Sequence, residues 1–169
     1  MDPNQLNSLA PDGPFGIHQV RIDDKGRLKL PVRFKQHLEA SFPGERLFVT
    51  SIDGCTGRIY PVSVWKRNLN FLDQFTEDPK RARRIMFVAN DHGQDGEPDS
   101  NGRILIHPKL RQTLAIEPAS EDDDRHLVWL QWIRDGIDIY NQAVYEKLAA
   151  AAYGDPEENA DFMIAKGLK

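Results

Sequence analysis

A stretch of sixteen residues occurs twice in the chain, and this repeat constrains the fold more than any other feature of the sequence. Residues 23–38 read DDKGRLKLPVRFKQHL, and residues 99–114 read DSNGRILIHPKLRQTL. Five of the sixteen positions are identical, and five more are conservative replacements. Self-similarity of this kind indicates that one supersecondary unit is built twice. A chain of 169 residues has room for two small units of that size.

A second similar block follows each copy. Arg58-Ile59-Tyr60 leads into an apolar stretch, and so does Asp138-Ile139-Tyr140. The offset between the copies grows from 76 to 80 residues, and the acidic stretch 121–125 can hold the extra residues in a surface loop. The predicted division is a flexible leader at 1–14, a first module at 15–78, a second module at 79–153, and a C-terminal tail at 154–169 that either docks as a loose helix or frays.

Each copy is predicted to contain two strands joined by a turn, a helix, two more strands and a second helix. The Asp-x-x-Gly-Arg sequence is the turn, in which glycine supplies the positive φ of a tight hairpin. Residues 27–30 alternate between basic and apolar, and Pro31 suits the start of a helix over 32–39. One copy has too few strands for a two-layer core, so the two copies are expected to close a small β-barrel together. The predicted fold class is mainly β with short helices.

The Asp-x-x-Gly-Arg turns carry the residues best suited to bind an anion. The arginine stands on the solvent face, and its planar fork of donors matches a phosphate or a guanine edge. The aspartate can accept from the turn amides or hold the arginine. A charged hairpin that is closed only by an Asp–Arg salt bridge is the structural alternative. The candidate DNA-binding residues are Asp23, Lys25, Gly26, Arg27 and Lys29 in the first copy, and Asp99, Asn101, Gly102 and Arg103 in the second.

Charge is distributed unevenly along a chain whose net charge is −4. Residues 1–90 hold 14 basic and 10 acidic side chains, whereas residues 91–169 hold 8 and 16. Asn101 and Leu105 replace the lysines of the first copy, so the second copy is expected to contribute less to phosphate affinity. A further basic cluster at 80–84 either touches phosphate or forms a solvated helix face, and we favour the latter.

The sequence predicts no enzyme, no metal site and no cofactor. The five histidines show no metal-ligand spacing, and the acidic residues 122–124 are best interpreted as a solvated loop. Cys55 is the only cysteine, which excludes an internal disulfide and suits a reducing cytoplasm. No apolar run approaches the roughly 20 residues that a membrane span needs, so no membrane partner is expected. The first sixteen residues lack the features of a signal peptide.

Four segments together resemble the MraZ family of bacterial transcriptional regulators. They are IDDKGRLKLP at 22–31, SIDGCTGRIYPVSVW at 51–65, RRIMFVAN at 83–90 and DSNGRILI at 99–106. The resemblance implies an AbrB-like swapped-hairpin fold, in which the two modules pair into a pseudo-symmetric double-split β-barrel. It also implies ring-like homo-oligomers, association with the nucleoid, and binding of double-stranded DNA at short direct repeats upstream of the cell-division and cell-wall gene cluster. By position, Asp23, Arg27, Asp99 and Arg103 would lie at the DNA-binding face.

The predicted function is therefore that of a sequence-specific DNA-binding transcriptional regulator. Single weak contacts would sum by avidity in an oligomer, so that a net-acidic chain can still bind DNA. The alternative is a protein-binding module of the same fold, such as an antitoxin whose acidic tail at 155–162 blocks a toxin. Duplication within one chain argues against that alternative, and gel filtration distinguishes a large ring from a small species.

Overall fold

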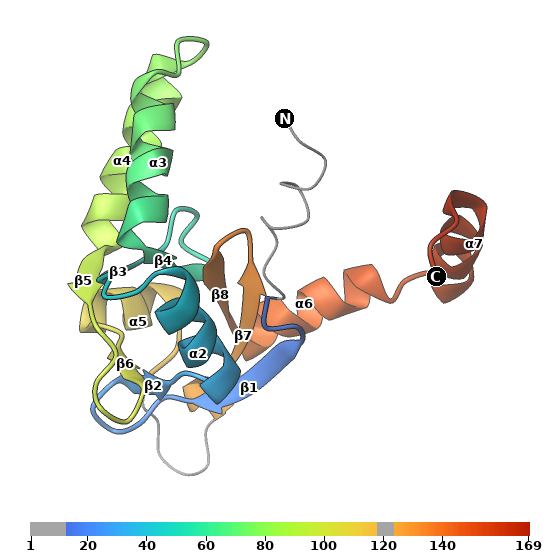
Figure 1. Ribbon diagram of the computed structural model, residues 1–169, viewed down its shortest axis with the longest axis horizontal. Coiled ribbons are helices and arrows are strands. Elements are labelled where there is room, and N and C mark those ends of the chain that lie inside the picture. The colour runs from blue at the N-terminus through green and yellow to red at the C-terminus, as the bar shows by residue number, and fades with distance from the viewer. Residues whose placement is uncertain (1–12, 118–123) are drawn as a thin grey trace.

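Two β-sheets and the helices around them form the body of the protein. The computed structural model describes residues 13–117 and 124–169 (Figure 1). The strands are β1 (Ile17–Arg21), β2 (Arg27–Lys29), β3 (Leu47–Thr50), β4 (Gly57–Pro61), β5 (Gln94–Gly96), β6 (Arg103–Leu105), β7 (Leu127–Ile133) and β8 (Gly136–Asn141). The α-helices are α2 (Val32–Ser41), α3 (Val62–Asp73), α4 (Pro79–His92), α5 (Pro108–Leu114), α6 (Gln142–Ala152) and α7 (Pro156–Lys166), and a 3₁₀ turn η1 covers Asp124–His126.

The strand order interleaves the two predicted copies. One sheet has the order β1-β7-β8-β4-β3-β5, and the second sheet consists of β2 and β6. β1 lies beside β7 and β5 beside β3, so the first strand of each copy pairs with a strand of the other. The counterparts in the two copies are β1 and β5, β2 and β6, β3 and β7, and β4 and β8. Exchanging each strand for its counterpart gives the same strand order, read from the opposite edge of the sheet. Because neither half of the chain holds a complete sheet, the core forms only when both halves fold together.

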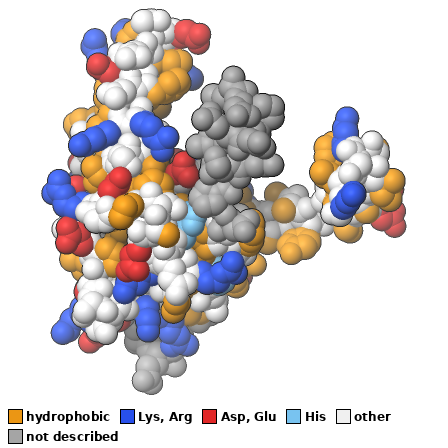
Figure 2. Space-filling view, viewed as in Figure 1, with side chains coloured by type: hydrophobic (Ala, Val, Ile, Leu, Met, Phe, Trp, Pro, Cys, Tyr) orange, Lys and Arg blue, Asp and Glu red, His pale blue; other side chains and the backbone are white. Residues whose placement is uncertain are grey.

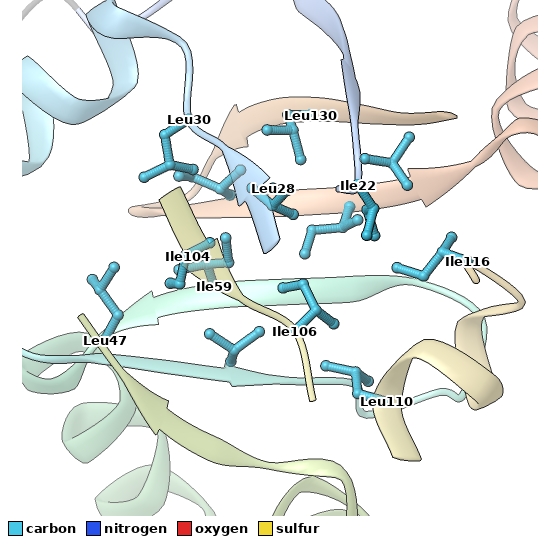
Figure 3. Close-up of a cluster of buried hydrophobic side chains, with 14 of the residues drawn as sticks. Ile22, Leu28, Leu30, Leu47, Ile59, Ile104, Ile106, Leu110, Ile116 and Leu130 are labelled. Atoms are coloured by element: carbon cyan, nitrogen blue, oxygen red, sulfur yellow. The ribbon is translucent and has the colours of Figure 1, made fainter. Parts of the chain in front are cut away.

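The main core fills the space between the two sheets. Leu28 and Leu30 point into it from one copy, and Ile104 and Ile106 from the other, each at most 2 % exposed (Figure 3). In the first copy the basic neighbours Arg27 and Lys29 face outward, so the alternation predicted for residues 27–30 is confirmed. Burying one such aliphatic side chain contributes about 1.5–3 kcal/mol, so this layer stabilises the fold substantially.

Helix exceeds strand in the chain, and the prediction of a mainly β protein needs correction. Helices account for 45 % and strands for 25 %, and the described strands form no closed barrel. The helix predicted over 32–39 is present as α2. The second helix predicted for each copy is also present, as α3 and α6, so the excess lies mainly in α4 and α7. Both of these helices begin at a proline that follows a capping aspartate, so their start signals were legible in the sequence.

Two helical extensions leave the body in different directions (Figure 1). α3 and α4 pack side by side and project from the sheet as a hairpin. α6 leads away on the other side to α7, so the tail predicted as a loose helix or a frayed end is helical over 156–166. None of the described helices combines the length and apolar character needed to cross a bilayer.

A mostly buried ion pair joins β4 to β8 in the middle of the larger sheet. Arg58 lies opposite Asp138 in register, donates to its carboxylate, and the two side chains are only 12 % and 13 % exposed. The Arg58 guanidinium also lies 4.9 Å from the centre of the Tyr60 ring. Burial and then the Asp138 carboxylate raise the pKa of Tyr140 to about 12, so its hydroxyl donates to Asp138 at 3.0 Å. Positions 58 and 138 are equivalent positions of the two copies, so this ion pair joins the first copy to the second.

We expect Arg58→Met to lower the free energy of unfolding by about 3 kcal/mol, because it leaves the Asp138 carboxylate without its partner. Urea denaturation measures the loss. The double variant Arg58→Met/Asp138→Leu should recover most of it, since an apolar pair carries no uncompensated charge. A double variant as unstable as the single one would contradict this account of the ion pair.

Candidate nucleic-acid interface

The two Asp-x-x-Gly-Arg turns have the same backbone geometry. In the turn at 23–27, the Asp23 amide donates to the Arg27 carbonyl at 2.8 Å, and the Gly26 amide donates to the Asp23 carbonyl at 3.0 Å. The corresponding bonds in the turn at 99–103 are 2.8 and 2.9 Å. The φ angles of the two glycines are 77° and 72°, a region that strains other residues. Both predicted turns are therefore present with glycine at the left-handed position.

Each aspartate binds both the turn backbone and the arginine. Asp23 Oδ1 accepts from the amides of Lys25 and Arg27 at 3.0 and 2.9 Å, and its Oδ2 accepts from Arg27 Nε at 2.8 Å. Asp99 accepts the equivalent bonds at 2.9, 3.0 and 2.8 Å. The predicted Asp–Arg salt bridge is thus present, but it occupies only Nε. Among the described residues, no group accepts from the terminal amino groups of Arg27 or Arg103, so both can still bind an oxygen acceptor.

The hydrogen bonds around the two carboxylates keep them ionised. Desolvation raises the pKa of Asp23, but the bonds from the Arg27 backbone and side chain and from the Lys25 amide outweigh it, so the pKa lies below its ordinary value. The pKa of Asp99 is also lowered, first by the bond from the Arg103 backbone amide. At neutral pH each turn therefore presents a fixed ion pair whose anionic half faces the protein backbone.

Strand pairing brings the two turns onto one surface. β2 and β6 run antiparallel, with Arg27 opposite Leu105 and Lys29 opposite Arg103. These four side chains project from the side opposite the buried Leu28 and Ile104 layer, and we call them the ribbon face (Arg27, Lys29, Arg103 and Leu105). Lys29 is exposed, and Leu105 is 46 % exposed. A two-stranded ribbon with such a face has the width to enter a DNA major groove.

The ribbon face is unequal in its two halves, as the sequence predicts. Lys25 at the tip of the first turn is exposed, whereas the second turn presents the neutral Asn101. In the sequence repeat, Lys29 of the first copy corresponds to Leu105 of the second. The first turn and its strand together therefore offer two more cations to a phosphate backbone than the second turn and its strand.

A contact between the copies supports each turn from below, and the sequence analysis missed it. A Cβ built on Gly26 would lie 1.8 Å from Nη1 of Arg111, and one on Gly102 would lie 3.2 Å from Cδ of Lys35. Arg111 also donates to the Ile106 carbonyl at 2.6 Å, which holds its side chain in place. Lys35 and Arg111 occupy matching positions in the repeat, and the retention of a cation at both was the available signal. Each helix therefore supports the hairpin of the other copy.

The remaining sequence candidates lie elsewhere. The basic cluster at 80–84 is on α4, in the helical hairpin that projects away from β2 and β6 (Figures 1 and 2). Cys55 is exposed in the turn between β3 and β4. The described residues contain no group of His, Cys, Asp and Glu that could hold a metal ion. Residues 1–12 of the predicted leader and 118–123 of the acidic stretch lie outside the described residues.

Comparison with known proteins associates the chain with one group of relatives. It is 37 % identical over 102 residues to a transcriptional regulator MraZ of Koribacter versatilis, a match that covers 60 % of this chain and 69 % of the relative. A protein of the same name from Acidobacterium capsulatum is 35 % identical over 101 residues, with 60 % and 68 % covered. One from Shewanella loihica is 26 % identical over 160 residues, with 88 % and 98 % covered. No protein-family model matches the chain.

Gly26→Ala should disrupt the first turn far more than Gly44→Ala disrupts its own loop. Both glycines have positive φ, at 77° and 69°, so the backbone strain is similar. Only at position 26 does the added methyl group overlap a neighbour, because Gly44 has nothing within 4 Å of the built Cβ. Thermal unfolding measures the difference, and equal changes in Tm would show that the Arg111 contact does not restrict this position.

Acid should weaken the turns through Asp23 and Asp99. The pKa of each carboxyl is lower in the folded protein than its ordinary value of about 3.9. The stability that results is fully present when the pH lies above this ordinary value, and it is lost as the pH falls through the pKa of the folded state. Below about pH 5, the unfolding free energy of Asp23→Asn/Asp99→Asn should therefore fall less steeply with pH than that of the wild type. Asp24→Asn is the control, because Asp24 takes no part in the turn bonds. Parallel pH profiles for the wild type and the double variant would refute the role of these carboxylates.

Proposed function

The chain belongs to the MraZ family of transcriptional regulators, and from that premise we propose that it binds double-stranded DNA sequence-specifically and regulates transcription. The observation that carries the proposal is the pair of aspartate-held arginines on one two-stranded ribbon. The proposed DNA-binding residues are Asp23, Lys25, Gly26, Arg27, Lys29, Asp99, Asn101, Gly102 and Arg103.

Each residue type has a separate part in the proposed contact. Arg27 and Arg103 read a guanine edge or clamp a phosphate with the amino groups that the aspartates leave free. Lys25 and Lys29 bind phosphates and add affinity without sequence preference. The aspartates orient the arginines, and the glycines let the turns approach the DNA backbone closely. Leu105 offers an apolar surface that suits a thymine methyl group.

The ribbon face of a single chain offers only three cations (Arg27, Lys29 and Arg103), and the chain carries a net charge of −4, so its proposed DNA contact is weak. We infer that the protein acts as a ring-like homo-oligomer whose ribbon faces bind successive direct repeats, because linked weak contacts gain affinity by avidity. The proposed target is DNA upstream of its own cell-division and cell-wall gene cluster, which places the protein in the cytoplasm, associated with the nucleoid. This target rests on the family alone.

We also infer that residues 15–78 and 79–153 are two AbrB-like modules and that the paired sheets are a double-split β-barrel. The invariance of the strand order under exchange of the copies supports this division. So does the position of the core, which lies between the two sheets and draws on both halves of the chain.

Arg27→Ala should reduce affinity for the upstream DNA by about tenfold or more, because a bidentate arginine contact contributes roughly 1–3 kcal/mol of discrimination. Fluorescence anisotropy with the cognate duplex and a scrambled duplex measures it. Arg103→Ala should cost less, since its half of the ribbon face has fewer cations. Lys29→Ala should lower the slope of log affinity against log salt by about one.

Arg67→Ala is the matched control, because Arg67 is an exposed arginine on α3 that lies outside the ribbon face. It should leave affinity for both duplexes unchanged. Unchanged affinity in Arg27→Ala would rule out the ribbon face as the contact. Equal or absent binding of wild-type protein to both duplexes would favour the antitoxin-like alternative and a protein partner.

A further inference from the structure

Helix α7 packs against none of the other residues that the structure describes in its own chain. Every residue from 150 to 169 is exposed, and these include Phe162 at 57 % and Ile164 at 78 %. Hydrophobic side chains are visible on the α7 end of the molecule in Figure 2. Its acidic residues Glu157, Glu158 and Asp161 form no ion pair within the described chain. A helix of 11 residues is marginal in water without packing against another surface. We therefore expect its apolar side chains to pack against a surface of another molecule.

Helix α4 presents a surface of opposite charge. Lys80, Arg84 and Phe87 follow one another at helical spacing on its exposed side, and Phe87 is 71 % exposed. We call these three residues the α4 stripe. Within the described part of the chain, neither Lys80 nor Arg84 has an acidic partner, whereas Arg81 pairs with Asp78. Lys and Arg side chains accordingly stand out along the helical hairpin in Figure 2.

The two helices start in the same way. Asp78 caps α4 by accepting from the Arg81 amide at 3.0 Å, and Asp155 caps α7 by accepting from the Glu158 amide at 2.9 Å. A proline follows each capping residue. Aligned on these caps, three of the four Lys and Arg residues of α4 correspond to acids of α7, Arg83 corresponds to Ala160, and the apolar residues at 85–87 correspond to apolar residues at 162–164. The pairs are Lys80/Glu157, Arg81/Glu158, Arg84/Asp161, Ile85/Phe162, Met86/Met163 and Phe87/Ile164.

We propose that α7 packs against α4 of a second copy of this chain, parallel and in register, so that its acids meet the α4 stripe and its apolar residues meet Phe87. The body already contains a contact of this kind, since Arg58 and Asp138 are corresponding positions of opposite charge that pair where the two copies meet. A parallel arrangement is required because charge lies in the first half of both helices and apolar residues in the second. The proposal rests on the oligomeric part of the proposed function.

The contact has to form between chains. α7 lies on the opposite side of the body from the α3–α4 hairpin, so the two surfaces of one chain are far apart (Figure 1). Joining one surface to a different surface of the next chain is a heterologous contact, which closes into a ring or continues as a filament. The charge pairs select the partner and its register, and the apolar residues supply most of the attraction.

A DNA phosphate fits the α4 stripe less well than α7 does. The hairpin projects away from the end of the molecule where β2 and β6 lie, so DNA on the ribbon face does not extend along it (Figure 1). Phe87 offers the DNA backbone nothing to bind, whereas it offers Ile164 or Phe162 an apolar partner. α7 carries three acidic residues and one basic residue, so its charge opposes contact with DNA.

Charge reversal tests the contact in the full-length protein. Lys80→Glu/Arg84→Glu places acids against acids, and Glu157→Lys/Asp161→Lys places bases against bases. Light scattering coupled to gel filtration measures the mass, for which one chain is 19.3 kDa. Each double variant should reduce the assembly to half its wild-type mass or less, and the combination of all four changes should restore it. Lys66→Glu/Arg67→Glu on α3 makes the same change of charge outside the stripe and should leave the mass unchanged.

If the combination of all four changes restores the mass, each double variant had lost a contact and had not merely failed to fold. A variant that failed to fold could not be rescued by a second charge reversal. A monomeric wild-type protein, an unchanged mass in either double variant, or no restoration in the combination overturns the proposal. Reduced DNA affinity in Lys80→Glu/Arg84→Glu with unchanged mass would mean that the stripe binds phosphate, and would also overturn it. Arg27→Ala should keep the full mass, so failure of the DNA contact and failure of this contact are distinguishable.

Cysteine cross-linking tests the direction of the helices in a Cys55→Ser background. Arg84→Cys with Asp161→Cys should form a disulfide between chains, because the two positions are in register. Arg84→Cys with Lys166→Cys should not, since these positions lie more than one helical turn out of register. Cross-linking of the second pair alone would show an arrangement other than the parallel one.

Discussion

The antiparallel pairing of β2 with β6 is the contact on which the rest of the structure depends. On one side it places Leu28 and Ile104 over the main core, where both are fully buried. On the other side it places two arginines from distant parts of the chain on one ribbon. The ladder continues beyond the strands, because Leu30 and Ile106 each donate to the glycine carbonyl of the opposite turn at 2.9 Å. Stability and the proposed DNA contact therefore come from the same few residues.

The two copies are alike where they build the fold and differ where they meet a partner. The turn bonds of Asp23 and Asp99 agree within 0.1 Å, and glycine and arginine recur at the same places. By contrast, Arg58 faces Asp138, and Lys29 corresponds to Leu105. Opposite charge at position 58 and its counterpart favours pairing of unlike copies over pairing of like ones. Duplication followed by divergence of this kind lets one chain form an interface with two distinct halves.

Local features of the sequence predicted local structure well. Turn geometry, the aspartate–arginine bond and the alternation over 27–30 depend on residues within a few positions of one another. Strand partners were beyond reach, because β1 pairs with β7 more than a hundred positions away and no local pattern specifies that register. The packing of Arg111 under Gly26 is a contact of the same long-range kind. Helix content was underestimated because no local pattern fixes how far α3, α4 and α6 extend, and because the sequence left the tail open between a loose helix and a frayed end.

The central claim is that both turns, and not one, meet DNA. Hydrogen exchange of the assembled protein, with and without the upstream duplex, tests it most directly, since DNA that rests on a turn slows the local opening that exchange requires. The account predicts slower exchange in peptides covering 22–30 and 98–106, and unchanged exchange in those covering α4. Protection of a single turn, or of α4 without the turns, would contradict it.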